Sequence, residues 1–291
     1  EDGREAKCWV GAVLYQEGRD AESISGYERL MSARPPSPLA PRTQYSVGRA
    51  RFATEDYRGA VASFDTVAAA GEGQLAEAST WYLGECRRLL GEYNLALIWY
   101  RRVPSSSPYA DDARFGIGAS HFALGELSEA VEAYAALAAM AGAPLQRDAL
   151  YHLGVAHYNA GSYAPAAEAL ATFIDGGSGT PVSPIDGARY WRLRALYELQ
   201  LFADAVKVGR KLVAEHPKSE HVPATRFYLG ESLYWQEAYA EARAAYETLV
   251  AYDRTGNGPS ERGTISGGPI SRRRRRTQKA TSARRLRHGA P

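Results

Sequence analysis

Residues 74–106 read QLAEASTWYLGECRRLLGEYNLALIWYRRVPSS, and this stretch decides the fold. Apolar residues recur at the i, i+3, i+4 and i+7 spacing of an amphipathic helix on both sides of Gly91, which indicates two helices joined by a short turn. Glycine just past the last residue of a helix is typical of a helix end, because it adopts the left-handed conformation without strain. The stretch therefore predicts a helix hairpin with Gly84 inside its first helix and Ala96 inside its second.

The same pattern returns throughout residues 1–253. A glycine, here called the marker, follows an aromatic-rich triplet, and successive markers are 34 to 39 residues apart. A small residue lies twelve positions after each marker. The residue sixteen positions after the marker is most often aromatic, and the residue nineteen positions after it is apolar. Self-similarity at such a period is the signature of a repeat architecture. The markers are Gly11, Gly48, Gly84, Gly118, Gly154, Leu193 and Gly230, and the small residues are Ser23, Ala60, Ala96, Ala130, Ala166, Ala205 and Ala242.

The glycines and alanines of this pattern predict close packing of helices. Glycine inside a helix costs about 1 kcal/mol relative to alanine, so six marker glycines in register indicate that packing compensates for the loss. Small residues let two helices approach closely, and the larger residue at position sixteen fills space against a neighbouring helix. Glycines between the paired helices predict the ends of the first helices, at Gly18, Gly91, Gly125 and Gly161.

The beginnings of the units carry helix-entry residues. Ser37-Pro38 and Ser107-Pro108 each place a hydroxyl residue before a proline, which predicts an N-cap followed by the first helical position. Ser219 keeps the predicted cap without the proline. The connection at 175–187 is longer than the others and is rich in glycine, so we expect a flexible joint there.

This pattern resembles the tetratricopeptide repeat, across residues 1–253. The resemblance implies an all-α fold, a right-handed α-solenoid of about seven helix hairpins. The string PSSSPYADDA at 104–113 is similar to the bacterial envelope branch of that superfamily, which includes the Tol–Pal accessory proteins and the lipoprotein of the outer-membrane assembly machinery. The expected units lie near 1–36, 37–73, 74–106, 107–142, 143–181, 182–218 and 219–253.

Residues 254–291 differ in kind from the rest. They hold ten Arg and one Lys against the single acid Glu261, and no aromatic residue, so a disordered basic tail is expected. The overall charge of +2 thus conceals an acidic array of −8 and a tail of +10. The pI therefore does not argue for nucleic-acid binding by the array. Two distant cysteines, Cys8 and Cys86, exclude a disulfide-dense scaffold and are expected to be half-buried thiols.

The sequence contains no pattern that predicts catalysis. It lacks a phosphate-binding Gly-x-x-x-x-Gly-Lys-Ser/Thr and a zinc-binding His-Glu-x-x-His, and Gly116-Ile117-Gly118 lacks the third glycine of a dinucleotide loop. His152 and His157 are five apart on one helix and do not form a metal pair. We therefore expect no enzyme activity, no cofactor and no metal. The sequence contains no stretch of eighteen apolar residues, so it predicts no membrane-spanning helix.

The resemblance implies a concave groove lined by the first helix of each unit. By that resemblance the lining positions lie three before, one after, and four and five after each marker. Aromatic residues just before the marker are expected mostly to pack between first helices, while Asn159, Arg194 and Trp235 are the strongest candidates for contact with a partner. The candidate groove residues are Arg49, Arg88, Tyr158, Asn159, Arg194, Tyr197, Glu231, Tyr234 and Trp235.

These observations predict a non-catalytic scaffold that binds a peptide or a partner helix in the groove. The envelope resemblance implies the bacterial periplasm or the outer-membrane periphery, the alternative being the cytoplasm. A competing hypothesis is that the Arg-rich tail binds nucleic acid or an acidic partner. Residues 1–15 show neither the basic nor the apolar region of a signal peptide. Whether a signal or a lipid anchor precedes Glu1, and the oligomeric state, stay open at this level.

Overall fold

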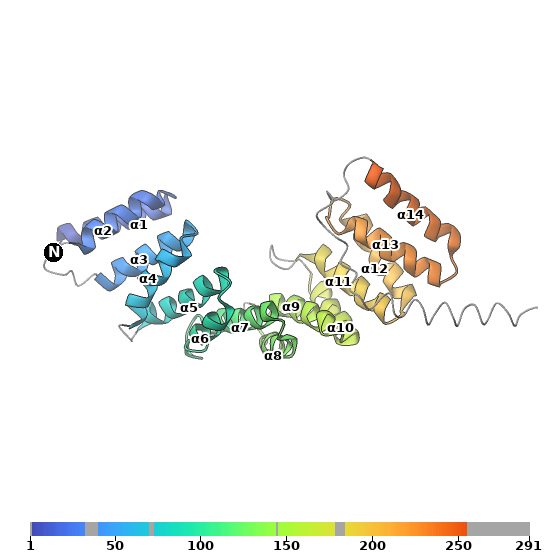
Figure 1. Cartoon of the computed structure of the whole chain (residues 1–291), viewed down its shortest axis with the longest axis horizontal. Helices are drawn as coiled ribbons and strands as arrows, with labels where there is room; N and C mark the ends of the chain where they lie inside the picture. Colours follow the sequence, from blue (N-terminus) through green and yellow to red (C-terminus); the bar gives the residue numbers. More distant parts are fainter. Residues whose placement is uncertain (1, 33–39, 70–72, 144, 178–183, 255–291) are drawn as a thin grey trace, which may run out of the picture.

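The computed structural model describes residues 2–32, 40–69, 73–143, 145–177 and 184–254. Within these ranges the chain forms fourteen α-helices and no strand, and the helices follow one another as seven antiparallel pairs (Figure 1). The pairs are α1 (Asp2–Gln16) with α2 (Asp20–Met31), α3 (Ala40–Ala53) with α4 (Tyr57–Ala69), α5 (Gln74–Leu89) with α6 (Tyr93–Tyr100), α7 (Ala110–Leu124) with α8 (Leu127–Ala138), α9 (Gln146–Asn159) with α10 (Tyr163–Asp175), α11 (Ile185–Glu198) with α12 (Phe202–Glu215), and α13 (Val222–Trp235) with α14 (Tyr239–Arg254). The predicted all-α solenoid of seven hairpins is confirmed.

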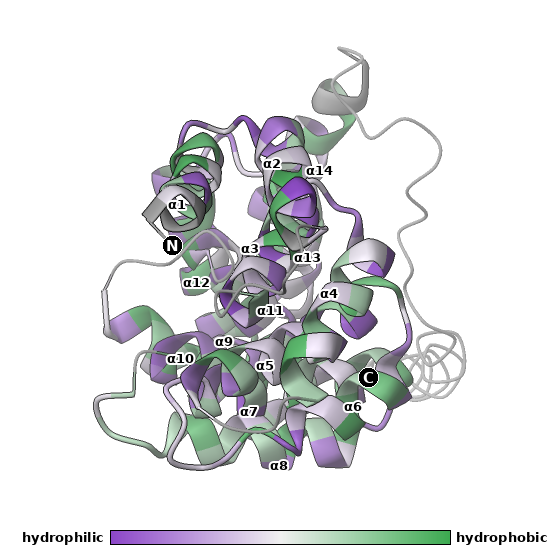
Figure 2. Ribbon diagram, turned by 90° about the vertical axis from the view of Figure 1, so that its left-hand side faces the viewer, coloured by the Kyte–Doolittle hydropathy of each residue, from purple (hydrophilic) through white to green (hydrophobic). Residues whose placement is uncertain are grey.

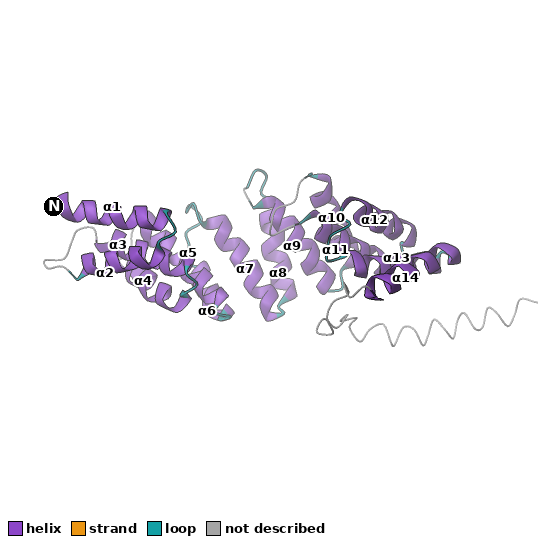
Figure 3. Ribbon diagram, turned by 90° about the horizontal axis from the view of Figure 1, so that it is seen from above, coloured by secondary structure: helices purple, strands orange, loops and turns teal. Residues whose placement is uncertain are grey.

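The helices stack into an elongated, curved array (Figures 1 and 3). Each second helix from α2 to α12 packs against its own first helix and against the first helix of the next pair. First helices also contact one another, as α3, α5 and α7 do, whereas successive second helices do not pack together in the described part of the chain. The first helices therefore form the inner side of the curve, and the second helices form its outer side.

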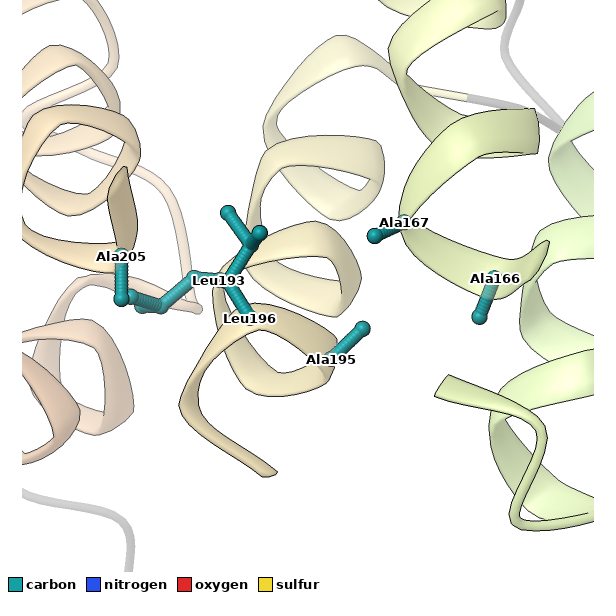
Figure 4. Close-up of a cluster of buried hydrophobic side chains, with 6 residues drawn as sticks. All are labelled: Ala166, Ala167, Leu193, Ala195, Leu196 and Ala205. Carbon is teal, nitrogen blue, oxygen red and sulfur yellow. The ribbon is translucent and has the colours of Figure 1, made fainter. Parts of the chain in front are cut away.

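The core is a series of small clusters along the array, and it has no single centre. Each cluster joins a second helix to the following first helix, as Phe64 of α4 joins Leu83 of α5. Figure 4 shows the cluster in which Leu193 and Ala195 of α11 lie between alanines of α10 and Ala205 of α12. Hydrophobic and hydrophilic residues are interleaved along the helices (Figure 2), as one apolar face on each helix requires.

A large residue on the second helix fits against the marker glycine of its own unit. A Cβ added to Gly84 would lie 2.5 Å from the Tyr100 ring, and one added to Gly116 would lie 2.4 Å from the same ring. Tyr100 is only 1% exposed. The glycines at the other markers are in equally close contact with a large side chain of their own second helix. These side chains are Tyr27, Phe64, Tyr134, Leu170 and Tyr246. The close packing predicted from the glycines is confirmed.

The sixth unit reverses the sizes of the two partners. Leu193 occupies its marker position, and Gly209 stands sixteen residues later, where the other units carry a large residue. A Cβ on Gly209 would lie 3.5 Å from Leu193 Cδ1, an ordinary contact. The helix pair therefore keeps one large and one small residue at its crossing, but the first helix now supplies the large one and the second helix the small one.

The turn inside every hairpin uses the left-handed conformation at the seventh residue after the marker. Gly18, Gly91, Gly125 and Gly161 have φ between 73° and 78°, as the glycine pattern predicts. The remaining three units hold this conformation without glycine, at Glu55, Gln200 and Glu237, with φ of 62° to 63°. The geometry of the turn is thus imposed by the packing of the two helices as well as by glycine.

The predicted helix caps are wrong in detail. Helix α7 begins at Ala110 and α13 at Val222, three residues after Ser107 and Ser219. The two serine hydroxyls accept hydrogen bonds from the backbone N–H of Tyr109 and His221, at 3.3 and 3.2 Å, so they close the turn before the helix. The expectation for Ser37-Pro38 lies outside the described residues, as do the tail at 255–291 and residues 178–183 of the long connection.

Both cysteines are more buried than the sequence predicts. Cys8 is 7% exposed and Cys86 is fully buried, and neither forms a disulfide. Burial raises the pKa of the Cys86 thiol to about 12, so this thiol stays protonated and acts as a small apolar residue.

We predict that Gly116→Ala destabilises the array although alanine is the better helix former. The added methyl group would lie 2.4 Å from the Tyr100 ring, which also packs closely against Gly84. Overpacking of a core costs about 1–3 kcal/mol, against a gain of about 1 kcal/mol in helix propensity. Urea unfolding followed by far-UV circular dichroism is expected to show a net loss of up to roughly 2 kcal/mol.

The matched control is Gly26→Ala in α2. Nothing lies within 4 Å of a Cβ at this position, so only the helix propensity changes and a gain of about 0.5–1 kcal/mol is expected. Equal effects of the two substitutions would contradict the packing account.

Candidate partner-binding surface

Two arginines on first helices stand one residue after their markers and lie on aromatic rings. We call Arg49 with Tyr15, Tyr45 and Tyr82 the N-terminal arginine cluster. The C-terminal arginine cluster consists of Arg194 with Tyr158, Tyr190, Trp191 and Tyr228. The equivalent position in the three units between them holds Glu85, Ala119 and Val155, so neither of the two cations has a second arginine in an adjoining unit at this position.

The C-terminal arginine cluster is built by three consecutive first helices. The Arg194 guanidinium carbon of α11 lies 4.6 Å from the ring centre of Tyr158 on α9 and 5.0 Å from that of Trp191. Its distances to the rings of Tyr190 and of Tyr228 on α13 are 5.7 and 5.6 Å. A cation over an aromatic face is stabilised by about 0.5–2 kcal/mol. The rings therefore hold the guanidinium in place.

The charge of Arg194 is not compensated by an acid. Its Nε is buried without a hydrogen-bond partner, and within the described ranges no carboxylate forms an ion pair with it. Burial alone lowers the pKa of Arg194, but Tyr228, Tyr158 and Tyr190 raise it, and its net pKa lies above the usual value. The side chain is thus a permanent, partly desolvated cation, which makes it a strong site for an anion.

The N-terminal arginine cluster repeats this arrangement. The Arg49 guanidinium carbon lies 5.0 Å from the Tyr15 ring centre, and its Nε is also buried without a partner. Burial lowers the pKa of Arg49, while Tyr82, Tyr15 and Tyr45 raise it above the usual value. Among the described residues no acid pairs with it.

A hollow opens beside Arg49. Its volume is about 430 Å³, and its lining includes Arg42, Arg49, Tyr45 and Ser46. Arg42 lies 4.8 Å over the ring of Trp9 and is exposed. The hollow between α1 and α3 therefore presents two guanidinium groups and hydroxyl donors.

Other charged residues predicted for the groove are already neutralised. Arg88 pairs with Glu85 of the preceding turn at 2.6 Å, and Tyr100 also donates to Glu85. Glu231 accepts hydrogen bonds from the hydroxyls of Tyr197 at 3.1 Å and Tyr246 at 2.8 Å. Burial raises the pKa of Tyr197 to about 12, so it stays a donor at neutral pH. These groups hold the array together and present less free charge than Arg49 and Arg194.

The remaining candidates lie apart from the arginine clusters or face their own helix. The Asn159 amide is exposed and donates to the Val155 carbonyl at 2.8 Å, so it caps its own helix. Trp235 is 41% exposed and stacks on Phe202. Tyr234 is 52% exposed and lies at the C-terminal end of the array, where it lines a hollow against α14.

Sequence reasoning missed three members of these clusters. Tyr82, Trp191 and Tyr228 each lie two residues before a marker, a position outside the predicted lining set. All three are large aromatic residues at the same position of the repeat, and this regularity could have identified them from the sequence. Aromatics three before the marker pack between units as predicted: Tyr45 contacts Tyr82, and Phe115 contacts His152.

Two histidines of the first helices, His121 and His152, have partners within the protein. His121 Nδ1 lies 2.6 Å from Glu126 Oε2, and His152 lies among the rings of Phe115, Tyr134 and Tyr151. In the described ranges no three His, Cys, Asp or Glu side chains are grouped to hold a metal ion. Over the same residues, no helix has the length and apolarity needed to cross a bilayer.

The fold and the inner surface define a helical-repeat solenoid. Two stretches, 45–111 and 115–181, match one tetratricopeptide repeat profile, and 224–254 matches a second, so that together more than half of the chain is covered. The chain belongs to the tetratricopeptide repeat family, whose members are generally non-catalytic scaffolds. Comparison with curated proteins finds no significant match.

Solved structures of repeat proteins share the fold. The C-terminal part of a TPR repeat-containing protein from Cytophaga hutchinsonii is 18% identical with a TM-score of 0.69, covering 85% of this chain and 96% of that one. A tetratricopeptide repeat protein from Parabacteroides merdae is 13% identical with a TM-score of 0.60, covering 86% and 93%. YrrB, described as a TPR protein with an unusual peptide-binding site, is 22% identical with a TM-score of 0.50, covering 61% and 88%.

We predict that stability falls on acidification because of His152. Burial lowers the pKa of His152 from 6.5 to about 4, against a smaller opposing effect of Asp148. Between these two values the unfolded chain binds a proton that the folded chain excludes, so stability is present above pH 6.5 and is lost as the pH falls toward 4. Unfolding at pH 7 and pH 5 is expected to differ by about 2 kcal/mol from this group.

The variant His152→Phe keeps a ring at this position and removes the titration. It is expected to lose that part of the pH dependence, while His157→Gln, at a less buried histidine, has a smaller effect. An unchanged pH profile in His152→Phe would show that the imidazole does not titrate in this window.

Proposed function

We propose that the protein is a non-catalytic scaffold whose inner side binds an extended segment of another protein, with acidic side chains of that segment contacting Arg49 and Arg194. The proposal rests chiefly on one observation: two partly buried guanidinium groups lie on aromatic rings and make no ion pair within the described residues. A partner carboxylate would supply the missing counter-charge.

The physical argument concerns the state of these arginines before binding. A guanidinium that is partly desolvated has already lost much of its hydration, so an incoming carboxylate has less water to displace. The rings fix the guanidinium plane, which reduces the entropy lost when a two-pronged carboxylate contact forms. Rigid aromatic groups and arginine are also the residues that dominate binding energy at protein interfaces.

The peptide-binding site in the printed description of YrrB supports a peptide as the kind of partner, as far as a shared fold can. The continuous row of first helices gives the length that an extended segment needs (Figure 3). The Arg-rich tail at 254–291 is the alternative site for nucleic acid or an acidic partner, and residues 255–291 lie outside the described residues.

We further propose that the protein acts in the bacterial periplasm or at the periphery of the outer membrane, in assembly of the cell envelope. The support is the string PSSSPYADDA at 104–113, which is similar to the envelope branch of the repeat family. Fractionation of cells that express the native gene tests the location, and recovery in the cytoplasm would overturn it.

We predict that Arg49→Gln and Arg194→Gln each weaken binding of a fluorescein-labelled peptide of alternating glutamate and alanine. Removal of one charged contact is expected to raise the Kd at least tenfold, which is about 1.4 kcal/mol. Fluorescence anisotropy at low salt gives the Kd, and circular dichroism checks that helical content is unchanged.

Two controls make the result specific. The peptide with glutamine in place of glutamate is expected to bind weakly, and Arg58→Gln, at an exposed arginine of the outer helix α4, should leave the Kd unchanged. Equal binding of both peptides would exclude carboxylate recognition, and unchanged binding by the Arg49 and Arg194 variants would exclude this surface.

A further inference from the structure

One arginine of the hollow beside Arg49 has no role in the proposed function. Arg42 is exposed and stands seven residues before Arg49 on α3, and both arginines line the hollow of about 430 Å³. Residues seven apart on a helix lie on the same face, about 10.5 Å apart along the axis. The two long side chains therefore reach one hollow from a single face of α3.

This pair of arginines distinguishes the second unit from the sixth. Arginine follows the marker in both units, but only the second unit also has arginine six residues before the marker. The sixth unit has Gly187 at that position, so Arg194 has no second guanidinium at this spacing on its helix. The other units hold Glu5, Ala78, Asp112, Asp148 and Ala224 there.

Neither guanidinium of the pair is neutralised by a described side chain. The guanidinium carbon of Arg42 lies 4.8 Å over the ring of Trp9, and that of Arg49 lies 5.0 Å from the ring centre of Tyr15. The Arg49 Nε is buried without a hydrogen-bond partner. Within the described ranges no carboxylate forms an ion pair with either arginine. The hollow therefore carries two positive charges that lack a counter-charge among these residues.

The walls of the hollow beside the arginines are largely apolar. Trp9 and Ala12 of α1 and Leu75 of α5 are part of its lining. Pockets for small ligands have volumes of about 300–1,000 Å³, so this hollow lies at the lower end of that range. It can therefore hold a side chain whose carbon atoms contact the walls and whose charged end contacts the arginines.

We propose that this hollow binds a phosphorylated side chain of the segment held on the inner side, with its phosphate oxygens contacting Arg42 and Arg49. This inference rests on the proposed function and names the chemistry of one position in the partner. A phosphomonoester carries a charge of about −1.5 to −2 at pH 7 and three strong acceptor oxygens, more than a carboxylate offers. Two guanidinium groups match such a group, whereas Arg194 alone matches a carboxylate.

The experiment compares matched fluorescein-labelled peptides by fluorescence anisotropy at low salt. The parent peptide alternates glutamate and alanine, and one glutamate near an end is replaced by phosphoserine or by serine. Peptides altered at either end are tested, because the segment can bind in two directions. The phosphoserine peptide is expected to bind at least tenfold more tightly than the glutamate parent for one of the two ends, and the serine peptide more weakly than the parent.

Arg42→Gln is the variant that separates the two kinds of contact. It is expected to lose the preference for phosphoserine while binding the glutamate peptide nearly as the wild type does, because only Arg49 and Arg194 serve that peptide. Arg42→Lys keeps the charge but loses the planar two-pronged contact, so it should keep part of the preference. Circular dichroism checks the helical content of each variant.

The matched control is Arg29→Gln on the outer helix α2. Arg29 is exposed, and its Nε donates to the Ser25 carbonyl of its own helix at 3.3 Å, away from the lining of the hollow. This variant removes the same charge from the same part of the array and should keep the full preference for phosphoserine.

Other results would overturn the inference. Equal binding of the phosphoserine and glutamate peptides at both ends would exclude it and leave the proposed function standing, as would a preference that survives Arg42→Gln. Inorganic phosphate that binds as tightly as the phosphoserine peptide would show that the hollow takes a free anion. Unchanged binding of the glutamate peptide by Arg49→Gln and Arg194→Gln would instead contradict the proposed function, on which this inference depends.

Discussion

The contact between a large side chain of each second helix and a glycine of its first helix is the constraint on which the rest of the structure depends. A ring such as Tyr100 fits only because Gly84 and Gly116, which both pack against it, have no side chains. The resulting short distance between helices sets the turn geometry, which three units keep at Glu55 and its equivalents without glycine. Because each second helix from α2 to α12 also packs against the first helix of the next unit, the described units form one array with the first helices along its inner side.

The inner side carries two kinds of charged side chain: acids that are hydrogen-bonded within the array, and arginines that have no acidic partner among the described residues. Glu85 and Glu231 stand one residue after their markers, as Arg49 and Arg194 do, but tyrosine hydroxyls of neighbouring helices bind the two acids. The arginines lie on rings instead, and rings stabilise a cation without neutralising it. The position one residue after the marker therefore holds an acid that stabilises the array in two units. In two other units the same position holds an arginine without an acidic partner. This difference in partner, which the residue type alone does not reveal, separates the candidate binding residues from the structural ones.

Much of the fold is predictable from spacing because each unit meets only its neighbours. Gly84, Ala96 and Tyr100 specify a hairpin locally, and repetition at 34 to 39 residues specifies the stacking. The helix starts were less predictable: Ser107 and Ser219 closed a turn before the helix, since serine hydroxyls serve both purposes. In the sixth unit Leu193 looked like a lost marker, but Gly209 restores the pair of large and small residues from the other helix.

The sequence by itself determined the helical class, the period, the hairpin turns and the positions of the small residues, because these follow from interactions within one unit. Only the tertiary structure decided which charges are compensated. Arg194 receives its rings from α9, α11 and α13, and Tyr158 and Tyr228 reach it from neighbouring helices through the angle at which those helices stack. That angle results from the packing contacts between units, which the sequence of a single unit does not contain.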